Sequence, residues 1–224
     1  MMPPVKACVF DVYGTLINLE ADIQRYADMI NSYEKVSAII RLWRSKQLEY
    51  TWLRNIMQHY VSFWQITKDA LDYALTAHDM NDYSFRDALL TSYIDPECYE
   101  EVIAGLQHIK TKQFKTAILS NGSPEMLFAA IRDTGMDHYI DSVLSVEEVQ
   151  LFKPEPLVYQ LAVDKMKLPK ENIAYFSSNA WDVAGAASFG LSAIWVNRTQ
   201  QLPERLPGKP CMEAVDISSV VAKL

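Results

Sequence analysis

Glycine is scarce in this chain, with 7 glycines among 224 residues, well below average usage. Each glycine is therefore expected to meet a local need of the backbone, such as a tight turn or a close approach. Residues 20–96 contain no glycine at all, and they show almost no alternation of apolar and polar residues. This stretch is therefore a candidate for a block of helices.

Cysteine and histidine are too few and too scattered to suggest disulfides or a metal centre. The three cysteines are odd in number and widely spaced, and they form no Cys-x-x-Cys pair. The four histidines do not pair with one another or with a cysteine at metal-ligand spacing. A reducing, cytoplasmic location is the simplest prediction. The residues concerned are Cys8, Cys98, Cys211, His59, His78, His108 and His138.

Long apolar runs and an excess of positive charge are also missing. No run approaches the length of a membrane span, and the first residues, MMPPVK, do not begin a signal peptide. The net charge of −7 argues against a nucleic-acid partner. Half of the residues are hydrophobic, as in an ordinary globular domain. We therefore expect neither nucleic acid nor membrane as a partner.

Residues 5–15 (VKACVFDVYGT) contain an apolar run that ends on an aspartate. The run is too short and too rich in β-type residues for a helix, so it predicts a buried strand. Asp11 follows directly, in a tight turn that includes Gly14. Ligands of open α/β sheets bind beside the carboxyl ends of strands, which makes Asp11 a candidate site residue. Taken alone, Asp11 could equally be a residue that caps the turn.

The rest of the chain divides into a helical block and an alternating block. Strands that alternate with helices predict a parallel sheet with right-handed crossovers. We therefore predict an α/β fold in which residues 1–18 and 97–224 form a Rossmann-type core and residues 19–96 form an all-helical insert. The predicted helices are 21–30, 36–57, 60–77, 84–93, 99–110, 124–134, 155–166, 180–189 and 215–224; the later strands are 115–120, 142–145, 173–177 and 192–197, and 200–210 is a surface loop.

Polar side chains stand at the carboxyl ends of several predicted strands. Because the ends of parallel strands share one edge of the sheet, we expect these residues to converge on a single pocket. Singly, the serines could cap helices, the asparagine before Gly122 could form a turn, and the last aspartate could face a helix dipole. Jointly, they favour a site. They are Asp11, Thr15, Ser120, Asn121, Lys153, Ser177, Asn179 and Asp182.

Five segments make this pattern specific: FDVYGTL (10–16), LWRSKQLEYTW (42–52), ILSNGSPE (118–125), FKPEPLVY (152–159) and SSNAWD (177–182). In them the chain resembles the haloacid dehalogenase (HAD) superfamily and, within it, the L-2-haloacid dehalogenases. The likeness in layout covers nearly the whole chain. It implies a HAD-like sheet sandwiched by helices, an inserted helical cap subdomain, and a homodimer formed through that insert.

Two positions distinguish the chain from the phosphatases that share this fold. Such phosphatases carry Asp-x-Asp, whose second carboxyl protonates the leaving alcohol; Tyr13 stands there, and a departing halide needs no proton. They also place acids near the last strand end to hold magnesium, where this chain has the neutral segment 177–179. Asp11 and Asp182 beside a lysine make a poor site for a hard cation. We therefore predict no metal and no cofactor.

The resemblance implies a reaction in two steps. Asp11 attacks C2 of a short (S)-2-haloalkanoate, expels the halide and inverts the carbon; water then hydrolyses the aspartyl ester to release an (R)-2-hydroxy acid. Lys153 orients Asp11 and favours its ionised form. Asp182, together with Lys153, is the candidate for activating the water. By resemblance, the hydrogen-bonded shell of Asp11 is completed by Thr15, Tyr159 and Ser177.

The resemblance also implies how the pocket holds its substrate. Ser120, with backbone N–H groups near Tyr13 and Asn121, holds the carboxylate, and Arg44 with Asn179 receives the halide. Without that likeness, Arg44 would be read as a surface residue, and the aromatic walls as core packing. Ser45 stands where relatives often have glutamine, which leaves that part of the rim open. The expected walls are Tyr13, Leu48, Phe63 and Trp181.

Two other functions remain open at this point. One is a magnesium-dependent phosphatase or another hydrolase of the superfamily, which Tyr13 and the SSNAWD segment disfavour. The other is a non-catalytic binding protein that retains the fold, which the combination of Asp11, Lys153 and Asp182 disfavours.

Overall fold

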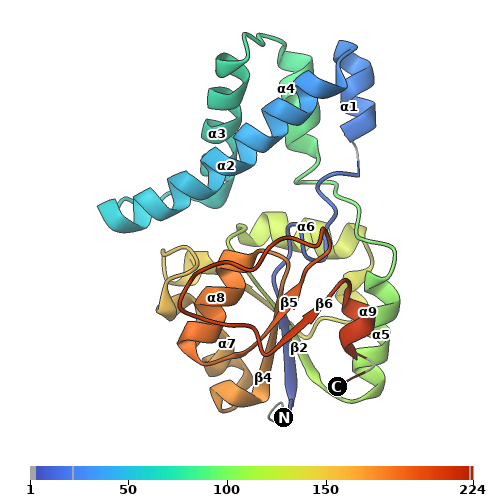
Figure 1. Ribbon diagram of the computed structural model, residues 1–224, viewed down its shortest axis with the longest axis vertical. Helices are drawn as coiled ribbons and strands as arrows, with labels where there is room; N and C mark the ends of the chain where they lie inside the picture. The colour runs from blue at the N-terminus through green and yellow to red at the C-terminus, as the bar shows by residue number, and fades with distance from the viewer. Residues whose placement is uncertain (1–3, 22, 222, 224) are drawn as a thin grey trace.

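A six-stranded parallel sheet lies at the centre of the computed structural model, which describes residues 4–21, 23–221 and 223 (Figure 1). The strand order is β3-β2-β1-β4-β5-β6. β1 is fully buried, and its last residue, Phe10, lies opposite Ile118 of β2 and Phe176 of β4. The strands are β1 (Ala7–Phe10), β2 (Lys115–Ser120), β3 (Ser142–Ser145), β4 (Ile173–Ser177), β5 (Ser192–Val196) and β6 (Met212–Ala214).

Helices cover both faces of the sheet, with α5 and α9 on one side and α7 and α8 on the other (Figure 1). The chain runs outward from β1 to β2 and β3, then returns to β4 and β5 on the other side of β1. Right-handed crossovers therefore place the helices of the two halves on opposite faces. They are α5 (Val102–Thr111), α6 (Pro124–Asp133), α7 (Pro156–Met166), α8 (Ala180–Phe189) and α9 (Ile217–Val221).

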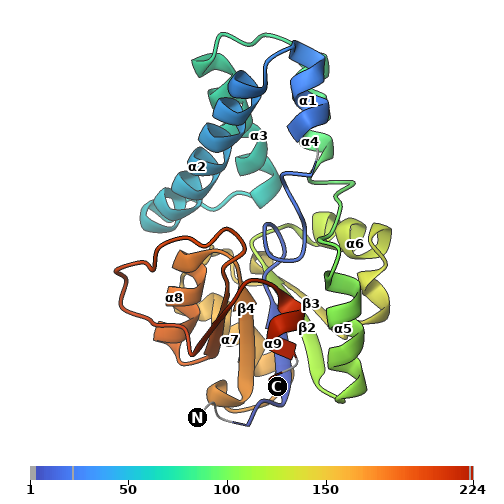
Figure 2. The ribbon, with the colours of Figure 1, turned by 45° about the vertical axis from the view of Figure 1, so that its right-hand side comes forward.

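Four further helices, here called the helical insert, lie between β1 and α5 in the chain and stand above the sheet (Figure 2). Three of them begin at a polar residue, Ser32, Ser62 or Asp82, whose side chain accepts a backbone hydrogen bond from the first turn. No helix in the described ranges is long and apolar enough to cross a membrane. The insert comprises α1 (Ile23–Ile30), α2 (Tyr33–Met57), α3 (Phe63–Ala77) and α4 (Tyr83–Thr91).

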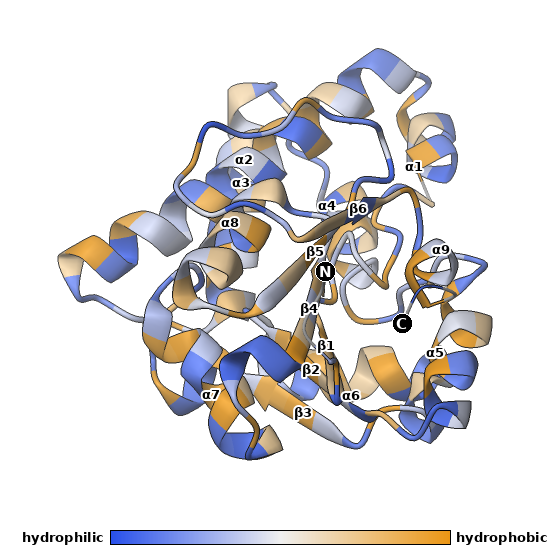
Figure 3. Ribbon diagram, turned by 60° about the horizontal axis from the view of Figure 1, so that its bottom comes forward, coloured by the Kyte–Doolittle hydropathy of each residue, from blue (hydrophilic) through white to orange (hydrophobic). Residues whose placement is uncertain are grey.

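The predicted parallel sheet between helical layers is confirmed, and its hydrophobic residues gather on the central strands (Figure 3). The prediction differs near the chain's end. β6 was not expected, because its three residues carry no apolar run and follow the loop 200–210. The helix expected over 215–224 is shorter, since α9 spans Ile217–Val221, and residues 222 and 224 lie outside the described ones. The 3₁₀ turns Met136–His138, Val146–Glu148 and Lys170–Asn172 were also missed.

A buried polar chain joins α2, α3 and the segment after α4. The Trp43 indole donates to the Thr67 backbone oxygen at 2.8 Å, and the Gln47 amide donates to the Thr67 hydroxyl at 2.7 Å. The Tyr93 hydroxyl donates to the Gln47 side-chain oxygen at 3.1 Å. Buried polar groups cost free energy when left unpaired. These hydrogen bonds therefore favour one register of α2 against α3.

We predict that Thr67→Val destabilises the protein, because valine keeps the shape but leaves the buried Gln47 amide without its acceptor. The expected cost is about 1–3 kcal/mol in the free energy of unfolding, measured by urea denaturation. Thr76→Val is the matched control: Thr76 lies on the same helix, is exposed and bonds only to a backbone carbonyl of its own helix. Equal losses in both variants would contradict the role given to Thr67.

Candidate active site

Lys153 lies between two carboxylates at the carboxyl edge of the sheet. Its Nζ donates to Asp11 Oδ1 at 2.9 Å and to Asp182 Oδ2 at 3.1 Å. Asp11 follows β1 directly, Asp182 lies in the first turn of α8, and Lys153 precedes α7. All three are buried: 7% of Asp11, 1% of Lys153 and none of Asp182 is exposed. The strand ends that the sequence analysis brought together thus meet around one ammonium group.

The other oxygen of Asp11, Oδ2, accepts three hydrogen bonds. The Thr15 hydroxyl and the Asn179 amide each donate to it at 2.9 Å, and the Ser177 hydroxyl donates at 3.4 Å. Thr15 is itself oriented, because its hydroxyl accepts the Ser178 N–H at 2.8 Å. Among the described residues, Oδ1 accepts a hydrogen bond from Lys153 alone, so it is the less constrained oxygen of the carboxylate.

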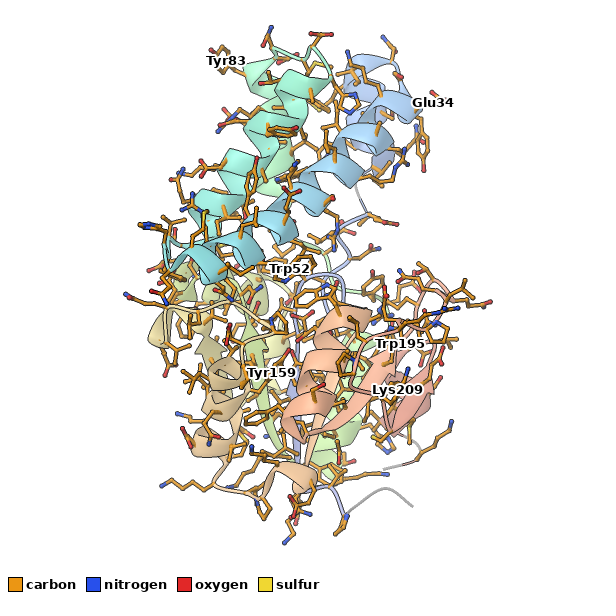
Figure 4. The ribbon with its side chains drawn as sticks, turned by 60° about the vertical axis from the view of Figure 1, so that its left-hand side comes forward. Glu34, Trp52, Tyr83, Tyr159, Trp195 and Lys209 are labelled. Carbon is orange, nitrogen blue, oxygen red and sulfur yellow. The ribbon has the colours of Figure 1, made fainter. Side chains whose placement is uncertain are left out.

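Tyr159 bonds to Asp182, and not to Asp11 as expected. Its hydroxyl donates to Asp182 Oδ1 at 2.8 Å, and the Tyr175 hydroxyl donates to Asp182 Oδ2 at 2.7 Å. Tyr159 lies inside the α/β core, well below the helical insert (Figure 4). Both side-chain oxygens of Asp182 therefore already accept hydrogen bonds from the protein. Tyr175 was missed by the sequence analysis, although a tyrosine within a buried strand needs a hydroxyl partner.

Burial and charge act in opposite directions at this cluster. Burial disfavours the charge of Lys153, but Asp11 and Asp182 outweigh it, so the pKa of Lys153 is raised and the ammonium is retained. Burial is the main cause of the raised pKa of Asp182, and the Asp11 charge adds to it, while Lys153 and the two tyrosines oppose it. Burial, followed by Asp182, also raises the pKa of Tyr159 and of Tyr175, which keeps both hydroxyls protonated donors.

A small cavity of about 40 Å³ opens between this cluster and the helical insert. It is large enough for a few atoms only, which indicates a small ligand. Ten of the candidate residues line it: Asp11, Tyr13, Arg44, Leu48, Phe63, Ser120, Asn121, Lys153, Asn179 and Trp181. The other four lie behind this lining, and they are Thr15, Tyr159, Ser177 and Asp182.

Arg44 reaches the cavity from the middle of α2. Within the described residues it has no hydrogen bond or salt bridge, so its positive charge is available to an anion. Gly14, in the turn that carries Asp11, holds a left-handed conformation (φ +84°), which favours glycine. Arg44 Nη2 lies beside this turn, 3.4 Å from where a Cβ on Gly14 would be.

Ser120 and Asn121 form the wall at the end of β2. The Ser120 hydroxyl accepts the Gly122 N–H at 3.1 Å, and the Asn121 side chain accepts the Lys153 N–H at 3.0 Å. Both side chains therefore make the hydrogen bonds expected of residues that only stabilise a turn, and both also line the cavity. The Ser177 hydroxyl likewise accepts the Asn179 N–H at 3.1 Å while it faces Asp11.

Tyr13 closes the cavity as a wall. Its hydroxyl donates to the Tyr93 carbonyl at 3.2 Å, and its ring packs on Phe63 and Tyr93. Burial raises its pKa, with smaller contributions from Tyr93 and Asp11. A phenol with a raised pKa is a poor proton donor. The Tyr13 side chain therefore contributes chiefly its shape to the cavity.

Three residues of the cavity lining were not among the candidates: Leu19, Gln47 and Tyr93. Gln47 follows Arg44 by three positions in a segment predicted to be helical, and that spacing places both on one face of α2. Leu19 lies between β1 and α1, where no periodic pattern marks it. Tyr93 was predicted as the last residue of a helix over 84–93, whereas α4 ends at Thr91 and leaves Tyr93 in the segment that joins the insert to the core.

The charges of the site do not favour a divalent cation. The Lys153 ammonium lies within hydrogen-bonding distance of both the Asp11 and the Asp182 carboxylates, so it offsets part of the negative charge that would attract a hard cation. Within residues 4–21, 23–221 and 223, no cluster of three or more His, Cys, Asp or Glu side chains is arranged to hold a metal ion.

Comparisons with known proteins agree with this geometry. A family model for haloacid dehalogenase-like hydrolases matches residues 5–190. (S)-2-haloacid dehalogenase 4A of Burkholderia cepacia is 38% identical over 205 residues, which cover 91% of this chain and 88% of that protein. A solved dehalogenase structure has a TM-score of 0.95 at 35% identity, covering 100% and 99% of the two chains. The L-2-haloacid dehalogenase of Xanthobacter autotrophicus, solved with chloropropionic acid covalently bound, has a TM-score of 0.88 at 29% identity, covering 97% of each.

The chain belongs to the haloacid dehalogenase-like hydrolase family. The likeness to L-2-haloacid dehalogenases, which the five segments indicated, is confirmed by relatives of that kind over most of the chain. The expectation of a hydrolase with a HAD-like fold is confirmed as well.

Gly185 provides a test of the layer behind the cavity. A Cβ at this position of α8 would lie 2.5 Å from the Tyr159 hydroxyl oxygen and 2.6 Å from Pro154 Cβ. We predict that Gly185→Ala lowers the free energy of unfolding by about 1–3 kcal/mol, because the packing cost exceeds the gain in helix propensity. Urea denaturation measures this change.

Gly105→Ala is the matched control, since Gly105 is also helical and the atom nearest to its added Cβ, Ile217 Cγ2, lies at 3.2 Å and not 2.5 Å. Its stability should change little. If Gly185→Ala were as stable as the wild type, Tyr159 would not be held tightly against α8.

Proposed function

We propose that the protein hydrolyses short (S)-2-haloalkanoic acids to (R)-2-hydroxy acids, through an ester formed on Asp11. The observation that carries this proposal is a buried carboxylate held by Lys153 that shares a small cavity with Arg44, whose guanidinium has no ion-pair partner among the described residues. A carboxylate nucleophile and a cation opposite it are the two charges needed to displace an anionic leaving group from carbon.

In the first step, Asp11 Oδ1 attacks C2 from the face opposite the halogen. Oδ2 is held by Thr15, Asn179 and Ser177, which orients the carboxylate and leaves Oδ1 to react. The new C–O bond takes its electron pair from Oδ1, and the halide leaves with the pair of the C–halogen bond. Burial removes most of the water that would otherwise solvate the nucleophile.

Arg44 receives the departing halide, and attack from the opposite side inverts C2. The Asn179 amide, which donates to Asp11 and also lines the cavity, is the second group assigned to the halide in this proposal. Ser120 and the backbone N–H groups near Tyr13 and Asn121 hold the substrate carboxylate. Leu48, Phe63 and Trp181 enclose the alkyl group.

In the second step, water attacks the carbonyl carbon of the Asp11 ester and releases the hydroxy acid with C2 still inverted. The proton lost by the water passes to Asp182 through Lys153, which donates to both carboxylates. Asp182 lies outside the cavity, so it takes this proton indirectly. Its raised pKa suits a temporary proton acceptor.

The relatives support this choice of reaction. The similar Burkholderia protein is an (S)-2-haloacid dehalogenase, and the similar Xanthobacter structure has chloropropionic acid covalently bound. Against the phosphatase alternative, the chain has no carboxylic acid at the position of Tyr13, and the Lys153 ammonium already pairs with Asp11.

We further propose that residues 19–96 act as a cap subdomain over a core of residues 1–18 and 97–224. Two joining segments contribute Leu19 and Tyr93 to the cavity, which supports a division at these places. We also propose that the enzyme acts in the cytoplasm as a homodimer formed through the insert, where α2 carries the exposed apolar side chains Leu53, Ile56 and Met57.

The decisive assay compares L- and D-2-chloropropionate, with EDTA present throughout. Chloride should be released from the L substrate, with D-lactate as the product because C2 is inverted. The release should continue in EDTA because the proposed site needs no metal. Asp11→Asn should lower kcat by at least about 10³-fold, since an amide is a poor nucleophile. Matched Asp133→Asn, at an exposed site at the end of α6, should retain activity.

Full activity of Asp11→Asn would exclude Asp11 as the nucleophile. Turnover that requires magnesium, or hydrolysis of p-nitrophenyl phosphate in its presence, would favour the phosphatase alternative. Tight binding of haloacid with no turnover would favour a binding protein.

The ester intermediate has an isotopic signature. In a single turnover in H₂¹⁸O, water attacks the Asp11 carbonyl carbon, so the heavy oxygen should appear in Asp11 while lactate receives an unlabelled oxygen from the enzyme. Mass spectrometry of the peptide that contains Asp11 measures this directly. Label found in lactate after one turnover would show that water attacks C2 itself.

A further inference from the structure

Asn55, in the last turn of α2, binds both backbone polar groups of Phe152 in the core. The Asn55 amide donates to the Phe152 carbonyl at 2.7 Å, and the Phe152 N–H donates to the Asn55 side-chain oxygen at 2.9 Å. This pair of bonds crosses from the helical insert to the loop before α7. Phe152 is the residue immediately before Lys153.

The ring of Phe152 is anchored to the insert as well. It stacks on Tyr60 with the ring centroids 5.0 Å apart, and it packs against Phe63 at 6.4 Å. Phe152 is completely buried, so these contacts replace solvent around the whole side chain. One turn before Asn55, Trp52 packs edge-on against Trp181 of α8 at 5.5 Å, at the boundary between insert and core (Figure 4).

Lys153 is thus held from two directions. Its N–H donates to the Asn121 side chain, which belongs to the core, while the preceding peptide is held by Asn55, which belongs to the insert. Its Nζ reaches Asp11 and Asp182 only when this short segment is in place. The position of the ammonium group therefore depends on the docking of α2.

The buried site also requires the insert to move. Asp11 is 7% exposed, Lys153 and Ser120 are each 1% exposed, and the cavity is roofed by Leu48 and Phe63 of the insert. The docked insert thus leaves little of Asp11 exposed, and a substrate reaches it more easily when α2 and α3 lift from the core. Lifting α2 breaks both Asn55 bonds and removes the ring contacts of Phe152.

We propose that Asn55 is a positioning residue that couples docking of the helical insert to placement of Lys153 beside Asp11. In the closed arrangement it completes the active site, and on opening it releases the segment that carries the lysine. Asn55 lies outside the cavity lining and acts through Phe152. The kinetic part of this inference rests on the proposed function, whereas the structural coupling does not.

Amide hydrogen exchange tests the coupling without any substrate. In Asn55→Ala, exchange at Phe152 and Lys153 should accelerate by about tenfold or more, while the amides of α6 keep their wild-type rates. Arg41→Ala is the matched control, since Arg41 is an exposed residue of the same helix and lies outside the cavity lining. If Lys153 exchanges at the same rate in both variants, Asn55 does not place the lysine.

Kinetics with L-2-chloropropionate form the second arm. Asn55→Ala should lower kcat by about 10- to 100-fold, because a displaced Lys153 weakens chemistry after binding, while KM changes by less than about threefold. Arg41→Ala should match the wild type. Faster exchange with an unchanged kcat would overturn the proposal. If the wild-type protein releases no chloride, the proposed function is refuted. The exchange experiment then still decides whether Asn55 places the lysine.

Asn55→Asp is a second variant, for the case in which the insert of Asn55→Ala does not fold. The carboxylate keeps an acceptor for the Phe152 N–H, but it replaces the donor by a charged oxygen that repels the Phe152 carbonyl. Its exchange rate at Lys153 and its kcat should depart from the wild type in the same direction as those of Asn55→Ala. Values identical to the wild type in both measurements would overturn the proposal.

Discussion

The rest of the site depends on one ammonium group held between two buried carboxylates. Removing three charges from water is costly, and the cost is offset only when each has partners at hydrogen-bonding distance. Lys153 has Asp11 and Asp182, Asp182 has two tyrosine hydroxyls, and Asp11 has three further donors. These partners come from β1, β4, α7 and α8, so the arrangement also constrains how the helices seat on the sheet.

The sequence predicts the parts of the site that follow from local pattern. A short apolar run that ends in a polar residue marks a strand end, and the parallel order of the strands brings such ends together, as at Asp11 and Ser120. The partner of Tyr159 could not be predicted in this way, because it depends on how α7 packs against α8. Gln47 and Tyr93 belong to a polar chain between segments far apart in the sequence, which no local spacing shows.

Tyr13 illustrates how one fold can support different chemistry. The position lies within reach of Asp11, where a carboxyl group would serve as a proton donor to a leaving alcohol. Here the hydroxyl is committed to the Tyr93 carbonyl, and the ring packs among other aromatic side chains. At this position the site has an aromatic side chain in place of a carboxylic acid, which suits a leaving group that departs as a stable anion and needs no proton.

The length of α2 has a mechanical consequence. Arg44, Leu48 and Asn55 lie on one uninterrupted helix, and the first and last of them are about 16 Å apart along its axis at 1.5 Å per residue. A helix of this kind moves as a stiff rod, so a tilt at one end displaces all three side chains in the same stroke. In the proposed mechanism, the arginine that receives the halide, the leucine above the cavity and the asparagine that holds the Lys153 segment therefore move together. Departure of the halide and release of the lysine segment would then accompany the same tilt of α2.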